Sequence, residues 1–278
     1  MASAIDELAQ TAWDHYWKVK QFALEADLRQ LGQLIDEESP SATRSPESWR
    51  ATCEYWLLRS HLRFTVMETD EGMRALQQAE AAAVSSGDPR CLPAVRAHAA
   101  ERALMDGRMQ DARGALRRAL DEARDPSQND GQISGDQAVA LMALRGRLTV
   151  LEATASARDQ QPQKETLGLL GRADLIAQQI GVERRVLGCA FGPMQLKADT
   201  IYILQILGMP EQAMDLAMRV QDSALAELRR AQFYADCGLA CSDLSDLERE
   251  AEYMDRATAL IPEMLERQPA PQPQPAAS

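Results

Sequence analysis

Two stretches of the sequence decide the fold: DGRMQDARGALRRAL at residues 106–120 and LGMPEQAMDLAMRV at residues 207–220. Each contains a glycine followed five residues later by an alanine, Gly107 with Ala112 and Gly208 with Ala213. Glycine can end a helix in the left-handed conformation without a Cβ clash, and alanine lets the returning helix pack closely against the first. The pattern therefore predicts two helical hairpins, each with its turn at the glycine.

Weaker copies of this pattern occur elsewhere in the chain. One has Gly238 on its first helix but Glu250 where the packing alanine is expected, and an earlier one has Met67 at the turn and Gly72 at the alanine position. Two-helix repeats of about 34 residues are typical of tetratricopeptide proteins, in which each hairpin buries its apolar face against its neighbours. The sequence thus predicts an all-α, tetratricopeptide-like superhelical stack of about six helical hairpins.

We expect residues 1–265 to form a single domain of successive hairpins. The predicted helices cover residues 5–23 and 25–37, 47–67 and 70–87, two helices within 88–123, 137–157 and 164–181, and then two hairpins between Phe191 and Pro262. No stretch shows the alternation of a β-strand. Residues 266–278 are rich in proline without apolar periodicity, which predicts a disordered tail.

Composition and charge exclude several classes of function. The net charge of −12 and a pI near 4.8 argue against direct nucleic-acid binding, because phosphate contacts require clustered Lys and Arg. We expect no signal peptide, because the opening MASAIDELAQ lacks the charged and then apolar pattern, and no membrane span, because no apolar run is long enough. Five scattered cysteines suit reduced thiols. Cys237 and Cys241 share a helical face but have no third ligand at metal-site spacing, so packing is favoured. We expect a cytoplasmic protein without a cofactor or metal.

From about Asp70 to Pro262 the chain resembles the tetratricopeptide-repeat C-terminal half of actinobacterial Xre-type helix-turn-helix transcriptional regulators. The resemblance is carried by GMRALQQAEAAAVSSGDPR at 72–90, ALMDGRMQDARGALRRAL at 103–120 and FGPMQLKADTIYILQILGMPEQAMDLAMRV at 191–220. It implies a repeat domain that senses a small molecule or peptide, or binds another protein. The chain departs from the family in starting directly in the repeats, without the DNA-binding domain, and in having Gln195 and Asp199 where the family more often has Asn and His.

Candidate contact residues follow from helical spacing. In such repeats the first helix of each hairpin lines the concave side, and inward positions recur at steps of three and four residues. Applied from Gly107, Gly208 and Gly238, and from the weaker second hairpin, this register predicts that a ligand or partner contacts Tyr202, Gln205, Gln195, His61, Glu101 and Gln232. The alternative is a solvated inner face without a ligand.

Two functions stay open at this stage. The first is a non-catalytic protein that binds a protein partner, peptide or small effector on its concave face, in regulation and with a homodimer allowed. The second is a biosynthetic-pathway enzyme that uses the groove as a substrate pocket. A histidine deep in a closed cavity, or buried charged pairs, would favour the enzyme, whereas an open, shallow channel would favour the binding protein.

No catalytic residue is predicted from the sequence. The three histidines, His15, His61 and His98, lie on separate predicted hairpins. Asp14 and His15 are adjacent on a helix and therefore point about 100° apart. We expect the nearby Trp13 and Trp17 to form the core of the first hairpin rather than an active site.

Overall fold

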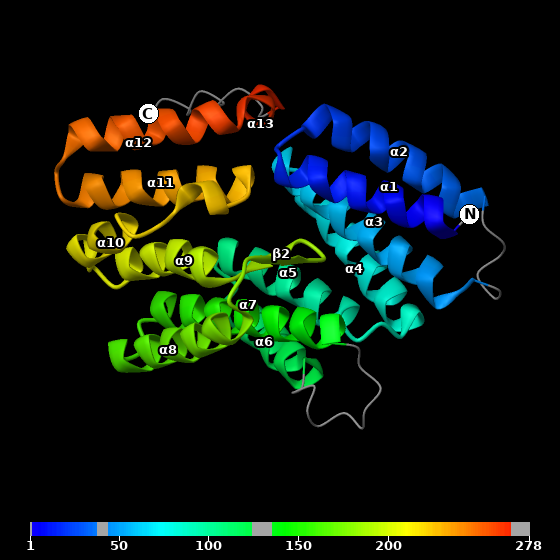
Figure 1. Ribbon diagram of the computed structural model, residues 1–278, viewed down its shortest axis with the longest axis horizontal. Coiled ribbons are helices and arrows are strands. Elements are labelled where there is room, and N and C mark those ends of the chain that lie inside the picture. Colours follow the sequence, from blue (N-terminus) through cyan, green and yellow to red (C-terminus); the bar gives the residue numbers. More distant parts are fainter. Residues whose placement is uncertain (1, 38–43, 124–134, 268–278) are drawn as a thin grey trace, which may run out of the picture.

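The computed structural model describes residues 2–37, 44–123 and 135–267, so the predicted tail lies almost wholly outside the described residues. In these residues the chain is all-helical apart from one small β-hairpin (Figure 1). The elements are α1 (Ala2–Trp17), α2 (Gln21–Glu37), α3 (Pro46–Thr65), α4 (Thr69–Ser86), α5 (Cys91–Met105), α6 (Met109–Glu122), α7 (Gly135–Arg158), α8 (Gln163–Ile180), β1 (Arg184–Val186), β2 (Cys189–Phe191), α9 (Pro193–Ile206), α10 (Pro210–Ala217), the 3₁₀ helix η3 (Asp222–Ala224), α11 (Glu227–Asp243), α12 (Leu247–Leu260) and α13 (Pro262–Arg267).

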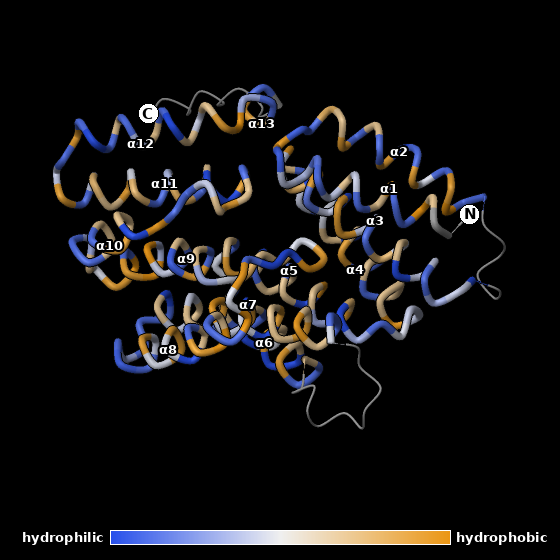
Figure 2. The backbone as a smooth tube through the Cα atoms, viewed as in Figure 1, coloured by the Kyte–Doolittle hydropathy of each residue, from blue (hydrophilic) through white to orange (hydrophobic). Residues whose placement is uncertain are grey.

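Twelve of these helices form six successive hairpins, from α1–α2 to α11–α12, and consecutive hairpins pack on one another. This arrangement confirms the predicted all-α stack of about six hairpins. Apolar and polar residues are interspersed along the helices (Figure 2). The amphipathic pattern is clear in α2, α4, α6, α10 and α12 and weak in α3, α5 and α9. No helix within the described ranges is long and apolar enough to cross a membrane.

Every hairpin turns in the same way. The first helix of each hairpin ends at one left-handed residue. The N–H of this residue donates to the carbonyl three residues earlier, as from Gly107 to Leu104. The N–H of the following residue donates to the carbonyl five residues earlier, as from Arg108 to Ala103. This is the Schellman motif that satisfies free carbonyls at a helix end. The six left-handed residues are Val19, Met67, Gly107, Gln160, Gly208 and Ser245. The turns at Gly107, Gly208 and Met67 were predicted correctly. Four of the six hairpins adopt this conformation without glycine.

The spacing of these turns shows how far the repeats have diverged. The turn residues stand at positions 19, 67, 107, 160, 208 and 245, and every interval between successive turns is longer than the 34 residues of a tetratricopeptide repeat. Much of the extra length lies in α7, which has 24 residues, and in the β-hairpin inserted between α8 and α9. The hairpins therefore stack without forming identical units.

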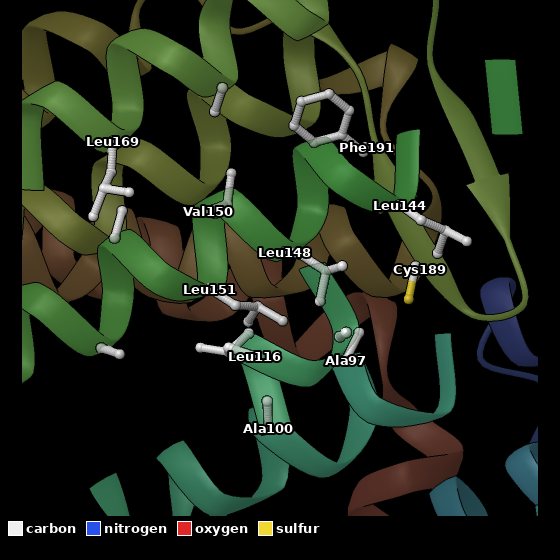
Figure 3. Close-up of a cluster of buried hydrophobic side chains, with 14 of the residues drawn as sticks. Ala97, Ala100, Leu116, Leu144, Leu148, Val150, Leu151, Leu169, Cys189 and Phe191 are labelled. Atoms are coloured by element: carbon white, nitrogen blue, oxygen red, sulfur yellow. The ribbon is translucent and has the colours of Figure 1, made fainter. Parts of the chain in front are cut away.

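Small residues set the close contacts that the sequence pattern predicted. Ala112 and Ala213 are fully buried. A Cβ atom on Gly72 would lie 2.4 Å from the ring of Phe64, which explains the glycine at that alanine position. Small and branched apolar residues likewise fill the largest core cluster, between α5, α6, α7, α8 and the β-hairpin (Figure 3).

Three features differ from the sequence prediction. The first helix ends at Trp17 rather than near residue 23, because Val19 adopts the left-handed conformation and makes the turn. Arg184–Val186 and Cys189–Phe191 pair as antiparallel strands where no strand was expected, since each is only three residues long. A short helix, α13, follows Pro262, where the last hairpin was predicted to end.

The two ends of the stack meet. Helix α11 contacts α1, and α13 contacts α2 (Figure 1). The carboxylate of Glu263 accepts a hydrogen bond from the backbone N–H of Phe22, at 3.1 Å, in the first turn of α2. A carboxylate is stabilised at this end of a helix by the free N–H groups and the helix dipole. The concave side is therefore closed into a ring rather than left as an open groove.

The turn geometry predicts opposite effects of one substitution at two glycines. Gly208 has φ of +69° and open space around it, whereas Gly168 lies inside α8, also with open space. Gly208→Ala should lower the free energy of unfolding by about 1–2 kcal/mol, because an L-residue is strained in this conformation. Gly168→Ala should raise it by about 0.5–1 kcal/mol, as expected within a helix. Urea unfolding of both variants measures these changes. A change in the free energy of unfolding of the same sign in both variants would contradict the assigned turn.

Candidate functional site

The tip of the β-hairpin reaches the centre of the ring. Leu187 and Gly188 connect the strands and both have positive φ, as the two central residues of a type I′ turn require. A Cβ atom at Gly188 would lie 2.6 Å from the Trp13 ring and 2.9 Å from Nε2 of His98. Only glycine therefore fits between these two side chains, which belong to α1 and α5.

The base of the same hairpin is fixed on α7. Phe191 is completely buried and belongs to the core cluster drawn in Figure 3. A Cβ atom on Gly146 would come within 2.2 Å of its ring. The carboxylate of Glu183 accepts hydrogen bonds from the backbone N–H groups of Met194, at 2.6 Å, and Gln195, at 3.2 Å, and thus caps α9. The hairpin is held at both ends as a rigid insert.

Beside the hairpin tip is a cavity of about 270 Å³. The first helices of five hairpins contribute to its wall, as predicted for the concave side, together with the hairpin tip and residues of α2 and α13. The lining residues are Tyr16, Trp17, Gln21, Ser60, His61, Phe64, Thr65, His98, Glu101, Arg102, Met105, Arg147, Gly188, Ala190, Leu228, Arg229, Gln232 and Met264. We refer to this space as the central cavity.

Two histidines meet in its wall. The ring centroids of His61 and His98 are 4.5 Å apart and the rings are nearly perpendicular. Nε2 of His98 lies 2.8 Å from the carbonyl oxygen of Leu187, and since a carbonyl only accepts, Nε2 carries the proton. The Tyr16 hydroxyl lies 3.5 Å from Nδ1 of His61. Burial lowers the pKa of His61 to about 3 and also lowers that of His98, so both imidazoles are neutral at physiological pH.

A buried ion-pair network adjoins the histidines. Arg147 donates to Glu101, at 2.7 Å, and to Asp199, at 2.8 Å, and Arg229 also donates to Asp199. Burial alone would raise the pKa of Glu101, but the guanidinium groups of Arg147 and Arg229 lower it to about 2. Glu101 is therefore ionised, and the network joins α5, α7, α9 and α11.

Three of the six predicted contact residues line the central cavity: His61, Glu101 and Gln232. The other three lie outside it and are engaged within the fold. Tyr202 accepts a hydrogen bond from Arg158, Gln205 donates to the backbone carbonyl of Asp236 at 2.6 Å, and Gln195 donates to Asp199 at 3.1 Å. A ligand contact by any of the six residues stays a prediction.

His98, Arg229, Tyr16 and Arg147 line the cavity and define its contacts, but they were not among the predicted contact residues. His98 and Arg229 each lie three residues before a predicted contact, Glu101 and Gln232, so the same helical register extended by one step reaches them. Tyr16 lies between Trp13 and Trp17, the two residues that were assigned to the first-hairpin core. Arg147 lies among apolar residues of α7, and no repeat register covered that helix.

Several other residues with a predicted role lie near the site or in the same hairpins. Trp13 and Trp17 are buried in the core, as expected. His15 contacts Asp27 of α2, with 2.5 Å between Nδ1 and Oδ2, rather than the adjacent Asp14. Cys237 and Cys241 are fully buried in an apolar cluster, which agrees with packing. The described part of the chain holds no group of three or more His, Cys, Asp or Glu side chains arranged for a metal ion.

A larger and more open cleft of about 650 Å³ lies between α1, α3, α7 and the β-hairpin. Several of its polar groups are already paired. Arg50 contacts Asp6 at 2.8 Å, and the indole N–H of Trp13 donates to Glu54 at 3.0 Å. Burial raises the pKa of Glu54 to about 7. We consider the central cavity the better candidate because it is less polar and gathers three of the predicted residues.

Comparison with known proteins gives little further guidance. No protein-family model matches the sequence, and no curated protein matches it significantly. Among solved structures, the chain is similar to BtubC (BKLC) from P. vanneervenii, with 15% identity and a TM-score of 0.46, over 99% of this chain and 97% of that chain. Identity and TM-score this low assign the chain neither a family nor a function.

The hairpin anchor predicts a coupled pair of substitutions. Gly146→Ala should lower the free energy of unfolding by about 1–3 kcal/mol, because the new methyl group overlaps the Phe191 ring. Phe191→Leu alone should also destabilise by creating a cavity, but the double variant should be more stable than the sum of the two losses implies. Chemical unfolding of the three variants measures this coupling, and strict additivity would exclude the contact.

The buried His61 predicts a specific pH dependence. Its folded pKa of about 3 lies below its unfolded value, so the unfolded state binds more protons below about pH 6.5 and stability falls as the pH falls. Between pH 7 and 5, wild type should therefore lose about 1–2 kcal/mol more stability than His61→Gln. Urea unfolding of both proteins at the two pH values tests this. Parallel losses would show that His61 is protonated freely in the folded protein.

Proposed function

We propose that this protein is a non-catalytic helical-repeat regulator that holds a small-molecule effector in the central cavity. The observation that carries the proposal is the meeting of His61, Glu101 and Gln232 in one cavity of about 270 Å³ within a closed ring. This volume is near the lower end of the range for ligand pockets, which supports a small molecule over a protein or peptide at this position.

The protonation states of the cavity groups support binding rather than acid–base catalysis. The pKa values of His61, at about 3, and Glu101, at about 2, lie far from neutrality. Burial raises the pKa of Cys189, next to His98, to about 12, and also raises that of Tyr16. General acid–base groups work best when their pKa is near the working pH. The cavity instead keeps one fixed pattern of hydrogen-bond donors and acceptors.

A route for passing on the occupied state is present in the ion-pair network. Glu101 lines the cavity, and through Arg147, Asp199 and Arg229 it is connected to four hairpins. In the proposed mechanism, a ligand that hydrogen-bonds to Glu101 would act through these ion pairs on helices that are far apart in the sequence. The resemblance to the repeat half of Xre-type regulators, which implies sensing, supports the same role.

The proposal is tested by native mass spectrometry of the full chain equilibrated with a small-molecule extract of cells. We expect one small molecule bound per chain. Glu101→Gln and His61→Ala should each reduce the bound fraction at least tenfold, because a buried hydrogen bond to a charged group or loss of a cavity wall costs 1.4 kcal/mol or more. Circular dichroism verifies that each variant keeps its helices.

Tyr202→Phe is the matched comparison, since Tyr202 was predicted to bind but lies outside the cavity. The proposal predicts that this variant binds like wild type. Loss of the ligand in Tyr202→Phe but not in Glu101→Gln would instead place the site on the fifth hairpin. Absence of any bound small molecule would contradict the proposal as a whole.

An enzyme is the second candidate, and one observation favours it. His61 and His98 lie together in a partly closed cavity beside buried charged pairs, which is the arrangement expected of a substrate pocket. Their lowered pKa values are the reason we rank it second. The same mass-spectrometric experiment followed over time separates the two functions, because an enzyme converts the bound molecule into one of different mass whereas a sensor releases it unchanged.

A further inference from the structure

The chemistry of the cavity wall points to one class of ligand, and this inference rests on the proposed function. The starting point is Glu101. One carboxylate oxygen, Oε1, accepts a hydrogen bond from Arg147 at 2.7 Å, and no described residue donates to the other. The side chain is one-third exposed, at 33%. An ionised oxygen that faces a cavity without a donor is available to an N–H or O–H group of a ligand.

The charges around the cavity are balanced before any ligand binds. Arg147 and Arg229 are matched by Glu101 and Asp199, and Arg102 is paired with Asp106, at 2.6 Å. A cationic ligand would meet three guanidinium groups, and an anionic one would have to compete with existing carboxylate partners. The site therefore favours a neutral molecule, because an unpaired charge brought into a partly closed cavity is costly.

The apolar part of the wall is mainly aromatic and thioether in character. Tyr16, Trp17 and Phe64 supply rings, and Met105 and Met264 supply flexible side chains that adapt to a flat surface. Tyr16 and Trp17 are in edge-to-face contact, with 5.0 Å between ring centroids. Such walls pack well against a planar ring, and the cavity volume of about 270 Å³ is compatible with a fused bicyclic system.

We propose that the central cavity binds a neutral, fused aromatic ligand whose single N–H group donates to the free oxygen of Glu101. Glu101 acts as the specificity-determining residue, because it distinguishes ligands with this donor from those of the same shape without it. The aromatic and methionine side chains supply contact area, which accepts many flat rings and discriminates weakly among them.

Indole and N-methylindole form a matched pair of probes, since they share the ring and differ at the donor. Titration calorimetry of the full chain should show one indole site and at least tenfold weaker binding of N-methylindole, the usual effect of losing a hydrogen bond to a charged group. Glu101→Gln should weaken indole binding by a similar factor and reduce the difference between the affinities of the two probes. Glu211→Gln removes an equivalent charge from exposed α10 and should change neither affinity.

The comparison of the two probes on wild type stands even if Glu101→Gln fails to fold. Equal affinities for indole and N-methylindole would overturn the assignment of Glu101 as the acceptor. Binding of tryptamine, the cationic analogue, tenfold tighter than indole would overturn the neutral class. If neither indole probe binds while native mass spectrometry detects a bound molecule, the ligand class is wrong and the proposed effector site survives. If both experiments are negative, the effector site fails as well.

Discussion

The hydrogen bond from His98 to the carbonyl of Leu187 is the contact on which the site depends. It ties the tip of the β-hairpin to α5, and Gly188 makes the approach possible because no other residue fits between Trp13 and His98. The same bond fixes the tautomer of His98, while burial keeps the ring neutral. Without this insert the centre of the ring would be an open channel, and the neighbouring groups would face water instead of a defined cavity.

The fold could be predicted from the sequence largely because the turn of a helical hairpin requires positive φ, which glycine adopts readily. Gly107 and Gly208 were identified since they tolerate positive φ. Val19, Gln160 and Ser245 adopt the same conformation at a cost that the packed hairpins offset, and no residue preference reveals them. Met67 was placed at a turn by the repeat register rather than by its residue type. The β-hairpin escaped prediction because three-residue strands carry almost no periodic signal and their position is set by distant contacts on Gly146 and His98.

The candidate site was predicted only in part, because the sequence encodes which face of a helix a residue occupies but not how the hairpins converge. Helical spacing places His61, Glu101 and Gln232 on inner faces, and this is a local property of each helix. Their convergence depends instead on how the hairpins stack and close, which spacing within one helix does not encode. Tyr202 and Gln205 occupy equivalent positions on α9, yet Arg158 and the backbone of Asp236 engage them. The same register thus yields cavity residues in some hairpins and structural contacts in another.

The contact between α13 and α2 distinguishes this stack from an open solenoid. In an open solenoid each repeat touches only its neighbours, so an end can fray without affecting the rest. Here Phe22 and Glu263, 241 residues apart in sequence, are hydrogen-bonded. The first and last hairpins therefore support each other, and loosening one removes support from the other. Because this contact closes a loop of 241 residues, we expect the ring to close late in folding, after the intervening hairpins are in place.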